Sequence, residues 1–443
     1  MDREQLRSWG GGHSSNSQKL DIDCEKDIPN LLQYVDERGV IPRAFGNSYG
    51  DQALNSEGTV ASIWNYSERN DLTITKEGRI TIHGGVHLGD VLEAAIHNSW
   101  ILPVVPGSEK ISIGGAIAAD AHGKNHFHKD SIASHILEMN VLTTKETIIR
   151  CSRSEEPELF WATIGGLGLT GLILRATLQL ERIESNELLV TSEKFTTYDE
   201  LFNHFKAESP TRSYSVAWLD LLSNKNPGRG IIQFADFGSE FNHSFDQKKT
   251  NRFEISRPLP FNTISKLNCN SFNAFKFRNH PSKILHKSIS IPGFLYPLDR
   301  LIGWNNLYGK KGLFQWQIVV PHSEEILLKE IIQTVGTLPV LPTLAVLKRL
   351  GSESNSYLSF CKSGWTLAVD FPNENASSRS LLSEFDRKIT EVGGRVYLAK
   401  DSGLEPELVT EMYPRFAEWK QIRKKYSQEN FWQSDFSRRL KLD

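Results

Sequence analysis

Four short stretches within the first 171 residues combine glycine with small or polar side chains, a composition that suits the binding of an anionic ligand. Glycine at such positions lets backbone N–H groups approach a phosphate closely. Because the stretches lie in a framework of alternating strands and helices, together they favour a dinucleotide site. They are residues 43–51, 106–110, 112–116 and 166–171.

The fourth stretch, GLGLTG at 166–171, matches the G-x-G-x-x-G pattern of nucleotide-binding Rossmann units. In that fold the motif follows a strand and opens a helix, whose N-terminus faces the pyrophosphate. Here the order is reversed, because a helix is expected over 158–163 and a strand over 172–180. The reversed order argues against a Rossmann unit. Two interpretations remain: a tight helix-to-strand connection whose glycines adopt positive φ, or glycines beside a cofactor in another fold.

The elements that position these stretches follow from hydrophobic periodicity. Residues 79–83 alternate between polar and apolar side chains, which predicts a strand, and the apolar stripe that begins at Leu88 predicts a one-faced helix. The small residues of 114–121 predict either a closely packed helix or a loop against a ligand. The same criteria predict strands over 102–105, 135–142 and 172–180 and a short helix over 156–163.

The character of the sequence changes near residue 185, which predicts a second domain. Residues 242–306 have little periodicity, so we expect an irregular segment there, either a flexible surface insertion or a mobile lid over a pocket. The remaining order is typical of an antiparallel sheet covered by helices, and the fold class is therefore α+β. The expected strands are 214–218, 230–234, 314–320 and 365–371, and the expected helices lie within 323–335, 378–392 and 404–440.

Composition excludes several classes of protein. The 443 residues are 39% hydrophobic and 23% charged, which is typical of a globular protein, and a net charge of −2 favours no nucleic-acid partner. Four widely separated cysteines exclude a disulfide-rich scaffold and the usual zinc-finger spacings, so we expect no metal site. The charged N-terminus and the lack of a run of about 18 apolar residues favour a cytoplasmic protein, with peripheral membrane contact left open.

Several motifs resemble the vanillyl-alcohol-oxidase-type (PCMH) family of FAD-binding oxidoreductases. Residues 41–51 resemble its N-terminal FAD loop, and residues 105–118 resemble its pyrophosphate segment. The sequence DAHGKNH at 120–126 narrows the resemblance to the branch of decaprenylphosphoryl-β-D-ribose 2′-oxidases. Residues 158–171, 397–402 and 412–415 fit the same branch.

The resemblance implies a two-domain PCMH-type fold with an antiparallel-sheet substrate domain. Residues 1–185 would form the FAD-binding domain, completed by 395–443, and residues 186–394 would form the substrate or cap domain, which includes the irregular segment. The cofactor would be FAD.

The resemblance also carries individual residues over by position. Those expected along FAD are Arg43, Phe45, Gly46, Asn47, Ser48, Tyr49, Gly50, Gly107, Ser108, Ser112, Gly114, Gly115, Ala119, His122, Gly123, Ile173 and Tyr397. Those expected around the substrate are Lys124, Trp218, Gln315, Gln317 and Lys348, with Lys400 and His122 as the catalytic candidates.

The sequence departs from the family pattern at five of its positions. Many relatives in the wider superfamily carry a histidine in the first loop that bonds covalently to the flavin, and here that place holds Asn47. An amide cannot form that link, so we expect non-covalent FAD. A reactive cysteine near the flavin is replaced by Ala368. A pocket serine, asparagine and aromatic residue correspond to Val216, Thr366 and Leu350, respectively.

The implied chemistry is oxidation of an alcohol, in which a hydride goes to the flavin and a base accepts the hydroxyl proton. Lys400 is one candidate base, because burial beside other cations lowers the pKa of a lysine. It could equally hold a substrate phosphate or the charge of the reduced flavin. His122 is the other candidate, since a neutral imidazole accepts a proton near pH 7.

The remaining polar candidates suit a charged sugar substrate. Lys124 and Lys348 would hold a phosphodiester by charge. Gln315 and Gln317 are two residues apart on an expected strand, so both face one side of the sheet and could bind sugar hydroxyls together.

We therefore expect oxidation of the 2′-hydroxyl of a polyprenyl-phosphoryl ribose to the keto form. A partner short-chain reductase would complete the epimerisation that yields the arabinose donor of cell-wall polysaccharides. The rivals are a free alditol or aldonolactone oxidase that uses oxygen, and a flavin-binding protein without catalysis. Peripheral contact at the inner face of the membrane stays open; a polyprenyl-linked substrate would need it, and a mobile lid within 242–306 could make it. Residues able to meet lipid headgroups are Phe275, Lys276, Phe277, Arg278, Lys283 and Lys287.

Overall fold

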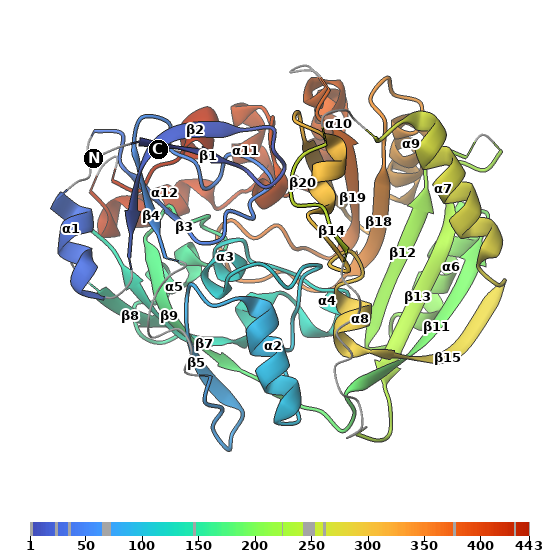
Figure 1. Cartoon of the computed structure of the whole chain (residues 1–443), viewed down its shortest axis with the longest axis horizontal. Coiled ribbons are helices and arrows are strands. Elements are labelled where there is room, and N and C mark those ends of the chain that lie inside the picture. Colours follow the sequence, from blue (N-terminus) through green and yellow to red (C-terminus); the bar gives the residue numbers. More distant parts are fainter. Residues whose placement is uncertain are drawn as a thin grey trace.

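Two four-stranded sheets lie in one lobe of the protein and one eight-stranded sheet lies in the other (Figure 1). This computed structural model describes residues 3–442 apart from 23–24, 34–36, 64–71, 145–147, 224, 242–252, 260–262, 375–377 and 429–430. Helices and antiparallel sheets occur in both lobes, which confirms the α+β class. None of the helices in the described part of the chain combines the length and apolarity needed to cross a membrane.

The first sheet has the order β1-β2-β4-β3 and carries the loop that follows β3. Strand β4 pairs in parallel with both β2 and β3, while β1 and β2 are antiparallel. The elements are β1 (Arg3–Arg7), β2 (Ser14–Asp21), α1 (Ile28–Gln33), β3 (Val40–Arg43) and β4 (Thr59–Ser62).

The second sheet has the antiparallel order β5-β9-β7-β8 and is covered by short helices. Alternation buries Ile80 and Ile82 of β5, and the predicted stripe of α2 is buried along its whole length. The predicted strand over 102–105 is wrong: only Trp100–Ile101 (β6) pairs with Glu181–Arg182 (β10), and Pro103 lacks the N–H that would continue the ladder. The other elements are β5 (Arg79–His83), α2 (Leu88–His97), α3 (Ile113–Ala118), α4 (His126–Lys129), β7 (Ile136–Leu142), β8 (Ile148–Ser152), α5 (Pro157–Thr163) and β9 (Leu172–Gln179).

The GLGLTG motif is a tight connection from α5 to β9, in the predicted reversed order. Leu167 and Gly168 have positive φ, and so does Gly171, where an added Cβ would lie 2.5 Å from the Leu142 carbonyl oxygen. The Leu167 N–H donates to the carbonyl of Ala118 at the end of α3. The motif therefore connects α5 to β9, a central strand of the second sheet.

The large sheet is antiparallel, with the order β15-β11-β13-β12-β18-β19-β17-β20. One face buries Trp316 and Trp365 beneath helices, with Phe205 of α6 packed on Trp365, whereas the other face, here called the polar face, carries Gln315, Gln317 and Asp370. The strands are β11 (Glu187–Phe195), β12 (Tyr214–Asp220), β13 (Arg229–Phe237), β15 (Lys283–Ser290), β17 (Leu313–Val320), β18 (Leu344–Leu350), β19 (Gly364–Pro372) and β20 (Arg395–Val396). The covering helices are α6 (Tyr198–Glu208), α9 (Glu325–Val335) and α10 (Ser383–Glu391).

Part of segment 242–306 is regular, in contrast to the irregular structure expected there. Helix α7 (Lys266–Asn279) begins at the capping residue Ser265 and is followed by β15 and by α8 (Ile291–Leu295). Asn273 is the buried residue of α7, so the helix shows no apolar stripe in the sequence. Two-residue strands, β14 (Phe253–Glu254) and β16 (Leu301–Ile302), also lie in this part, while 242–252 and 260–262 are outside the described residues.

The chain returns to the first lobe through α11 (Pro406–Met412), α12 (Phe416–Tyr426) and α13 (Asp435–Arg439). Buried Arg423 of α12 donates to the carbonyl oxygens of Leu169 and Leu442, each at 3.0 Å, and to that of Trp432. One guanidinium therefore holds the GLGLTG connection and the C-terminal tail together.

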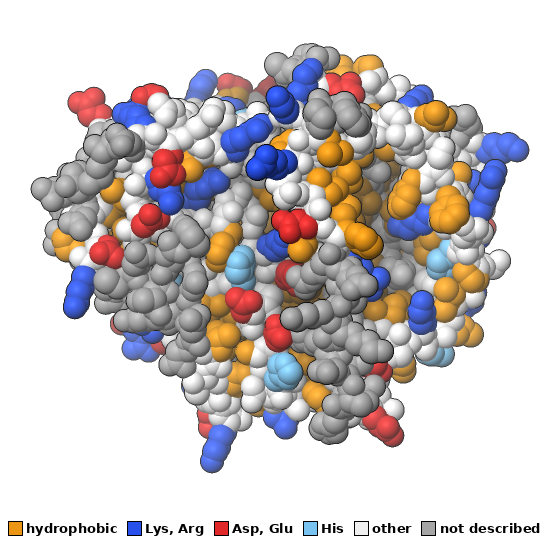
Figure 2. Space-filling view, viewed as in Figure 1, with side chains coloured by type: hydrophobic (Ala, Val, Ile, Leu, Met, Phe, Trp, Pro, Cys, Tyr) orange, Lys and Arg blue, Asp and Glu red, His pale blue; other side chains and the backbone are white. Residues whose placement is uncertain are grey.

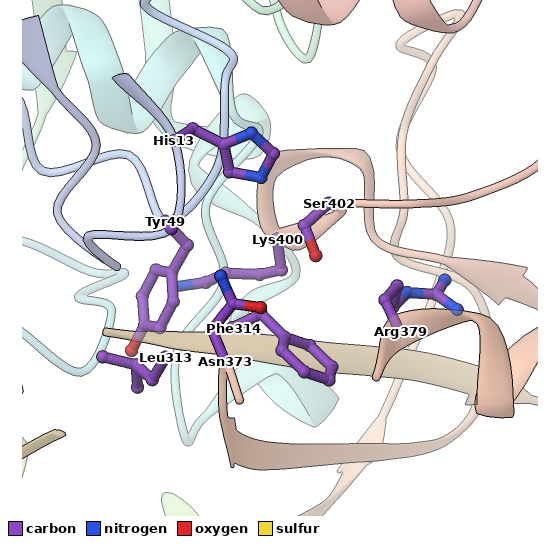
Figure 3. A pocket seen from close by; sticks show the side chains of 9 residues that line it. His13, Tyr49, Leu313, Phe314, Asn373, Arg379, Lys400 and Ser402 are labelled. Carbon is purple, nitrogen blue, oxygen red and sulfur yellow. The ribbon is translucent and has the colours of Figure 1, made fainter. Parts of the chain in front are cut away.

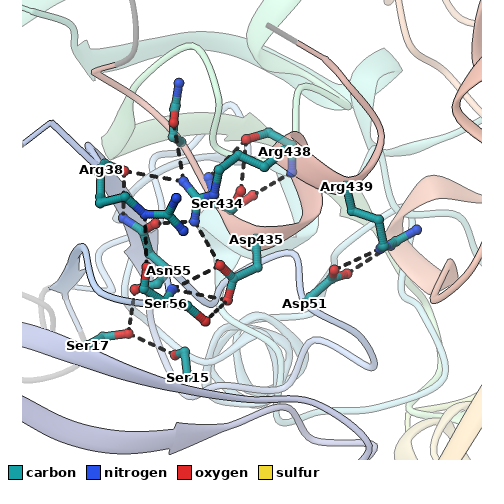
Figure 4. Close-up of polar contacts among 12 residues, drawn as sticks. Ser15, Ser17, Arg38, Asp51, Asn55, Ser56, Ser434, Asp435, Arg438 and Arg439 are labelled. Carbon is teal, nitrogen blue, oxygen red and sulfur yellow. Dashed lines mark hydrogen bonds and ion pairs between the residues drawn. The ribbon is translucent and has the colours of Figure 1, made fainter. Parts of the chain in front are cut away.

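Helix α13 fixes the loop after β3 through paired charges (Figure 4). Arg439 binds both carboxylate oxygens of Asp51 at 2.9 Å and reaches Asp401 at the same distance. The side chain of Arg438 contacts Asn55, and Asp435 accepts hydrogen bonds from Ser56 (Figure 4). The C-terminal helix α13 thus fixes the position of Asp51, the last residue of the stretch 43–51.

Candidate active site

The polar face of the large sheet carries most of the predicted substrate residues. In the strand register, Gln317 of β17 lies beside Ala368 of β19, which lies beside Val346 of β18 and then Trp218 of β12. Gln315 lies beside Asp370 in the next row of this face. Trp218 is three strands from Gln317, a separation of about 14 Å, so the face is wide enough for an extended ligand.

His122 faces this sheet from the segment after α3. Its Nε2 lies 2.9 Å from Gln317 Nε2, which also lies 3.1 Å from Thr366 Oγ1. An amide that donates to both leaves the imidazole proton on Nδ1, a buried atom without a hydrogen-bond partner. Burial is the main cause that holds the pKa of His122 well below its usual value, followed by the charge of Lys348. His122 is therefore a neutral donor toward a ligand.

Tyr397 borders the site next to His122 and Phe360. Its hydroxyl donates to the Ala119 carbonyl at 2.6 Å, and its ring stacks on Phe360, which also packs against His122. The backbone N–H of Tyr397 donates to the backbone carbonyl of Gln317 at 2.8 Å. These contacts tie β17 to the end of α3, and the neighbouring 3-10 turn Leu398–Lys400 brings in Lys400.

Three lysines gather here from distant segments. Burial lowers the pKa of Lys400 to about 7, and the pKa of Lys348 to about 8. Burial and the nearby Lys348 lower the pKa of Lys124 to about 7. The Lys124 ammonium donates to the carbonyl oxygens of Phe294 and Leu295 of α8. The cluster thus offers positive charge that is held out of water.

The ammonium of Lys400 lies 3.6 Å from the centre of the Tyr49 ring. Its stem forms one wall of a cavity of about 220 Å³, which is also lined by Phe314, Asn373 and Ser402 (Figure 3). The close-up shows the Lys400 side chain running toward Tyr49 (Figure 3). Lys400 thus links the first-lobe loop to the large sheet.

Asp370 is the acidic member of the site that sequence reasoning missed. It is 1% exposed, and burial raises the pKa of its carboxyl to about 6. Its Oδ1 accepts a 2.6 Å hydrogen bond from Gln315 Nε2. The available signal was period-two alternation from Thr366 and Ala368, which puts residue 370 on the same face.

The expected cofactor residues form two groups in the first lobe. The Asn47 side chain donates to the Lys110 carbonyl, and Phe45 stacks on His87 with ring centres 3.4 Å apart. Ser112 caps α3 by accepting from Gly115 N at 3.0 Å. The first group is Arg43, Phe45, Gly46, Asn47, Ser48, Tyr49 and Gly50, after β3; the second is Gly107, Ser108, Ser112, Gly114, Gly115, Ala119, His122 and Gly123, around α3.

Two observations show that these residues leave room and a free donor for a bound cofactor such as FAD. A Cβ at Gly107 would meet no atom within 4 Å, so backbone there borders open space. The unpartnered Nδ1 of His122 is a buried donor without an acceptor. Two other expected residues lie apart from both groups in sequence: Ile173 is in β9, and Tyr397 follows β20.

The class of protein follows from this fold and site together with a family match. Residues 20–152 match the family described as FAD binding domain, and the chain is an FAD-dependent oxidoreductase. It is 33% identical to decaprenylphosphoryl-beta-D-ribose oxidase of Mycolicibacterium smegmatis over 99% of this chain and 98% of that protein. The chain therefore belongs to the decaprenylphosphoryl-β-D-ribose oxidase family.

The chain is also similar to two further proteins. An uncharacterized protein in the mprA 5′ region of Streptomyces coelicolor is 30% identical over 81% of this chain and all of its own length. Cytokinin dehydrogenase 2 of Arabidopsis thaliana is 31% identical, over 35% of this chain and 31% of its own length. The second similarity covers a smaller part of both chains.

Proposed function

We propose that the protein oxidises the 2′-hydroxyl of a polyprenyl-phosphoryl ribose to the keto form. The observation that carries this proposal is the cluster of Lys124, Lys348 and Lys400 beside the paired amides of Gln315 and Gln317. Amides suit sugar hydroxyls, and ammonium groups suit a phosphodiester. A short-chain reductase would then reduce the keto sugar with inverted configuration.

We propose that FAD is held without a covalent bond, because Asn47 offers an amide where attachment needs a nucleophilic ring. Residues 43–50 and the segment around α3 would bind the cofactor, and His122 Nδ1 would donate to it or to the substrate. When bound, FAD supplies the acceptor for a hydride. The chain itself orients the alcohol, excludes water and carries the proton.

An anaerobic visible spectrum tests the substrate class. We expect the purified protein to be yellow and its flavin band to bleach when a polyprenyl-phosphoryl ribose is added, because the alcohol reduces the flavin. Free alditols and aldonolactones at the same concentration serve as controls, and we expect them to leave the band unchanged. Bleaching by a free alditol or lactone alone would replace the lipid-phosphate substrate with a free sugar.

We further propose that the protein meets the membrane through a surface made by α7 and β15, here called the α7–β15 surface. Leu267, Phe272, Phe275 and Leu285 are each more than 60% exposed there. The two elements contain lysine and arginine and no acidic residue, so the surface suits anionic headgroups. Apolar and basic side chains lie side by side over α7, on the right of Figure 2.

Vesicle sedimentation tests this surface. We expect the protein to bind phosphatidylglycerol vesicles more tightly than phosphatidylcholine vesicles, and 150 mM salt to weaken binding. The double variant Phe272→Ser/Phe275→Ser should bind at least about tenfold less tightly, because two exposed aromatic side chains that would enter the bilayer are lost. Ile326→Ser is the matched control, since Ile326 is 81% exposed on α9. Equal binding by the double variant and the control would contradict the surface.

A further inference from the structure

Asp370 lies on the polar face of the large sheet, beside Gln315, and has one carboxylate oxygen without a hydrogen-bond partner. Its Oδ1 is bound by Gln315, but its Oδ2 is buried and has no hydrogen-bond partner. An unpartnered carboxylate oxygen in a protein interior is costly, and its presence here points to use by a ligand. The groups that face Asp370 are Gln315 of β17, Tyr49 of the first-lobe loop, Tyr308 and Lys400.

Neither candidate base from the sequence has a comparable free acceptor. The acceptor nitrogen of His122 already receives the Gln317 amide, so the ring presents an N–H to a ligand. The Lys400 ammonium lies over the Tyr49 ring, and it accepts a proton only after it has lost one. A negative Asp370 nearby favours the charged form of Lys400.

We propose that Asp370 is the catalytic base, with Oδ2 accepting the proton of the substrate hydroxyl while Lys400 keeps its positive charge. This inference rests on the proposed alcohol oxidation. The proton of the hydroxyl would pass to Oδ2, and the electron pair of the broken O–H bond would form the C=O bond. The carbinol hydrogen would leave with its bonding pair as a hydride, which bound oxidised FAD would accept. Two electrons and one hydrogen nucleus would thus reach the flavin, and one proton would remain on Asp370.

Replacement of Asp370 by asparagine tests the proposal, because Asn keeps an Oδ1 acceptor for Gln315 and removes the basic oxygen. We expect FAD binding to stay within about threefold of wild type and the rate of anaerobic flavin reduction to fall by about 10²- to 10⁴-fold. Asp236→Asn is the matched control, since Asp236 lies on β13 and pairs with Arg212 away from this face. Reduction by Asp370→Asn within threefold of wild type would overturn the proposal.

The pH profile separates Asp370 from Lys400. With Asp370 as base, the wild-type rate rises as pH increases through about 6, where the carboxyl loses its proton, and Asp370→Asn loses this limb. With Lys400 as base, the limb would survive in Asp370→Asn and move to lower pH, because the neighbouring negative charge is gone. That second outcome would overturn the assignment to Asp370.

A readout without turnover keeps the test independent of folding and of substrate identity. Infrared difference spectra between pH 5 and pH 8 of the FAD-loaded wild type should contain a carboxylic-acid band that Asp370→Asn lacks. If the variant does not fold, a wild-type rate that is flat between pH 5 and pH 7 still overturns the proposal. Failure of wild-type bleaching by polyprenyl-phosphoryl ribose, with bleaching by another alcohol, would change the substrate alone and leave Asp370 to be tested with that alcohol.

Discussion

Replacement of Lys400 by methionine should slow flavin reduction by about 10²- to 10³-fold and leave FAD bound. Methionine keeps most of the apolar stem that lines the cavity and removes the ammonium above Tyr49. The positive charge would stabilise the negative charge that reaches the flavin during hydride transfer, and burial makes this interaction stronger than it is in water. Stopped-flow absorbance of the anaerobic reaction measures the rate.

The same lysine predicts a falling limb at higher pH. Burial lowers the pKa of Lys400 to about 7, so the amine is charged below that pH and neutral above it. The reduction rate should therefore fall as pH rises through about 7, and Lys400→Met should lack this limb. Lys388→Met, which removes an exposed ammonium paired with Glu330, is the control. An unchanged rate in Lys400→Met would remove Lys400 from the reaction.

Replacement of Arg423 by methionine should destabilise the protein by about 3 kcal/mol or more. The buried guanidinium donates to the carbonyl oxygens of Leu169, Leu442 and Trp432. Each buried acceptor left without a donor costs about 1–3 kcal/mol. We propose that the C-terminal segment completes the FAD-binding unit, so the variant should also bind FAD more weakly.

Urea unfolding followed by tryptophan fluorescence, with FAD titrated in parallel, measures both effects. Arg150→Met is the control, because Arg150 is an exposed residue paired with Glu138 and should change stability by less than about 0.5 kcal/mol. Equal stability of the two variants would show that the three carbonyls find other donors. Lost stability with unchanged FAD affinity would show that the C-terminal tail takes no part in FAD binding.

Sequence periodicity predicted the elements that bury one face. The strand at 79–83, the helix from Leu88 and the strands at 314–320 and 365–371 all exist, because apolar alternation directly reflects burial. Helix α7 escaped prediction because it buries Asn273 instead of an apolar stripe. The apolar stretch at 102–105 misled because residues can be buried without a strand's hydrogen bonds.

The candidate site was likewise predictable from sequence only in part. Motifs and resemblance led to the FAD-dependent class, but the meeting of Lys124, Lys348 and Lys400 depends on contacts between segments more than 50 residues apart. Asp370 sits inside an apolar run, so its polarity looks incidental until the register of β19 puts it beside Gln315. The register between strands that are distant in sequence cannot be predicted from neighbouring residues, whereas the local hydrophobic pattern can.

Strands β17 and β19 have consequences for how this protein can evolve. Along each strand, odd and even positions serve different purposes: Trp316 and Leu367 fill the core, while Gln315 and Ala368 face the candidate active site. Selection for a new sugar can therefore act on every second residue without loss of the packing that keeps the sheet folded. Descendants of this chain could change substrates while inheriting an unchanged interior.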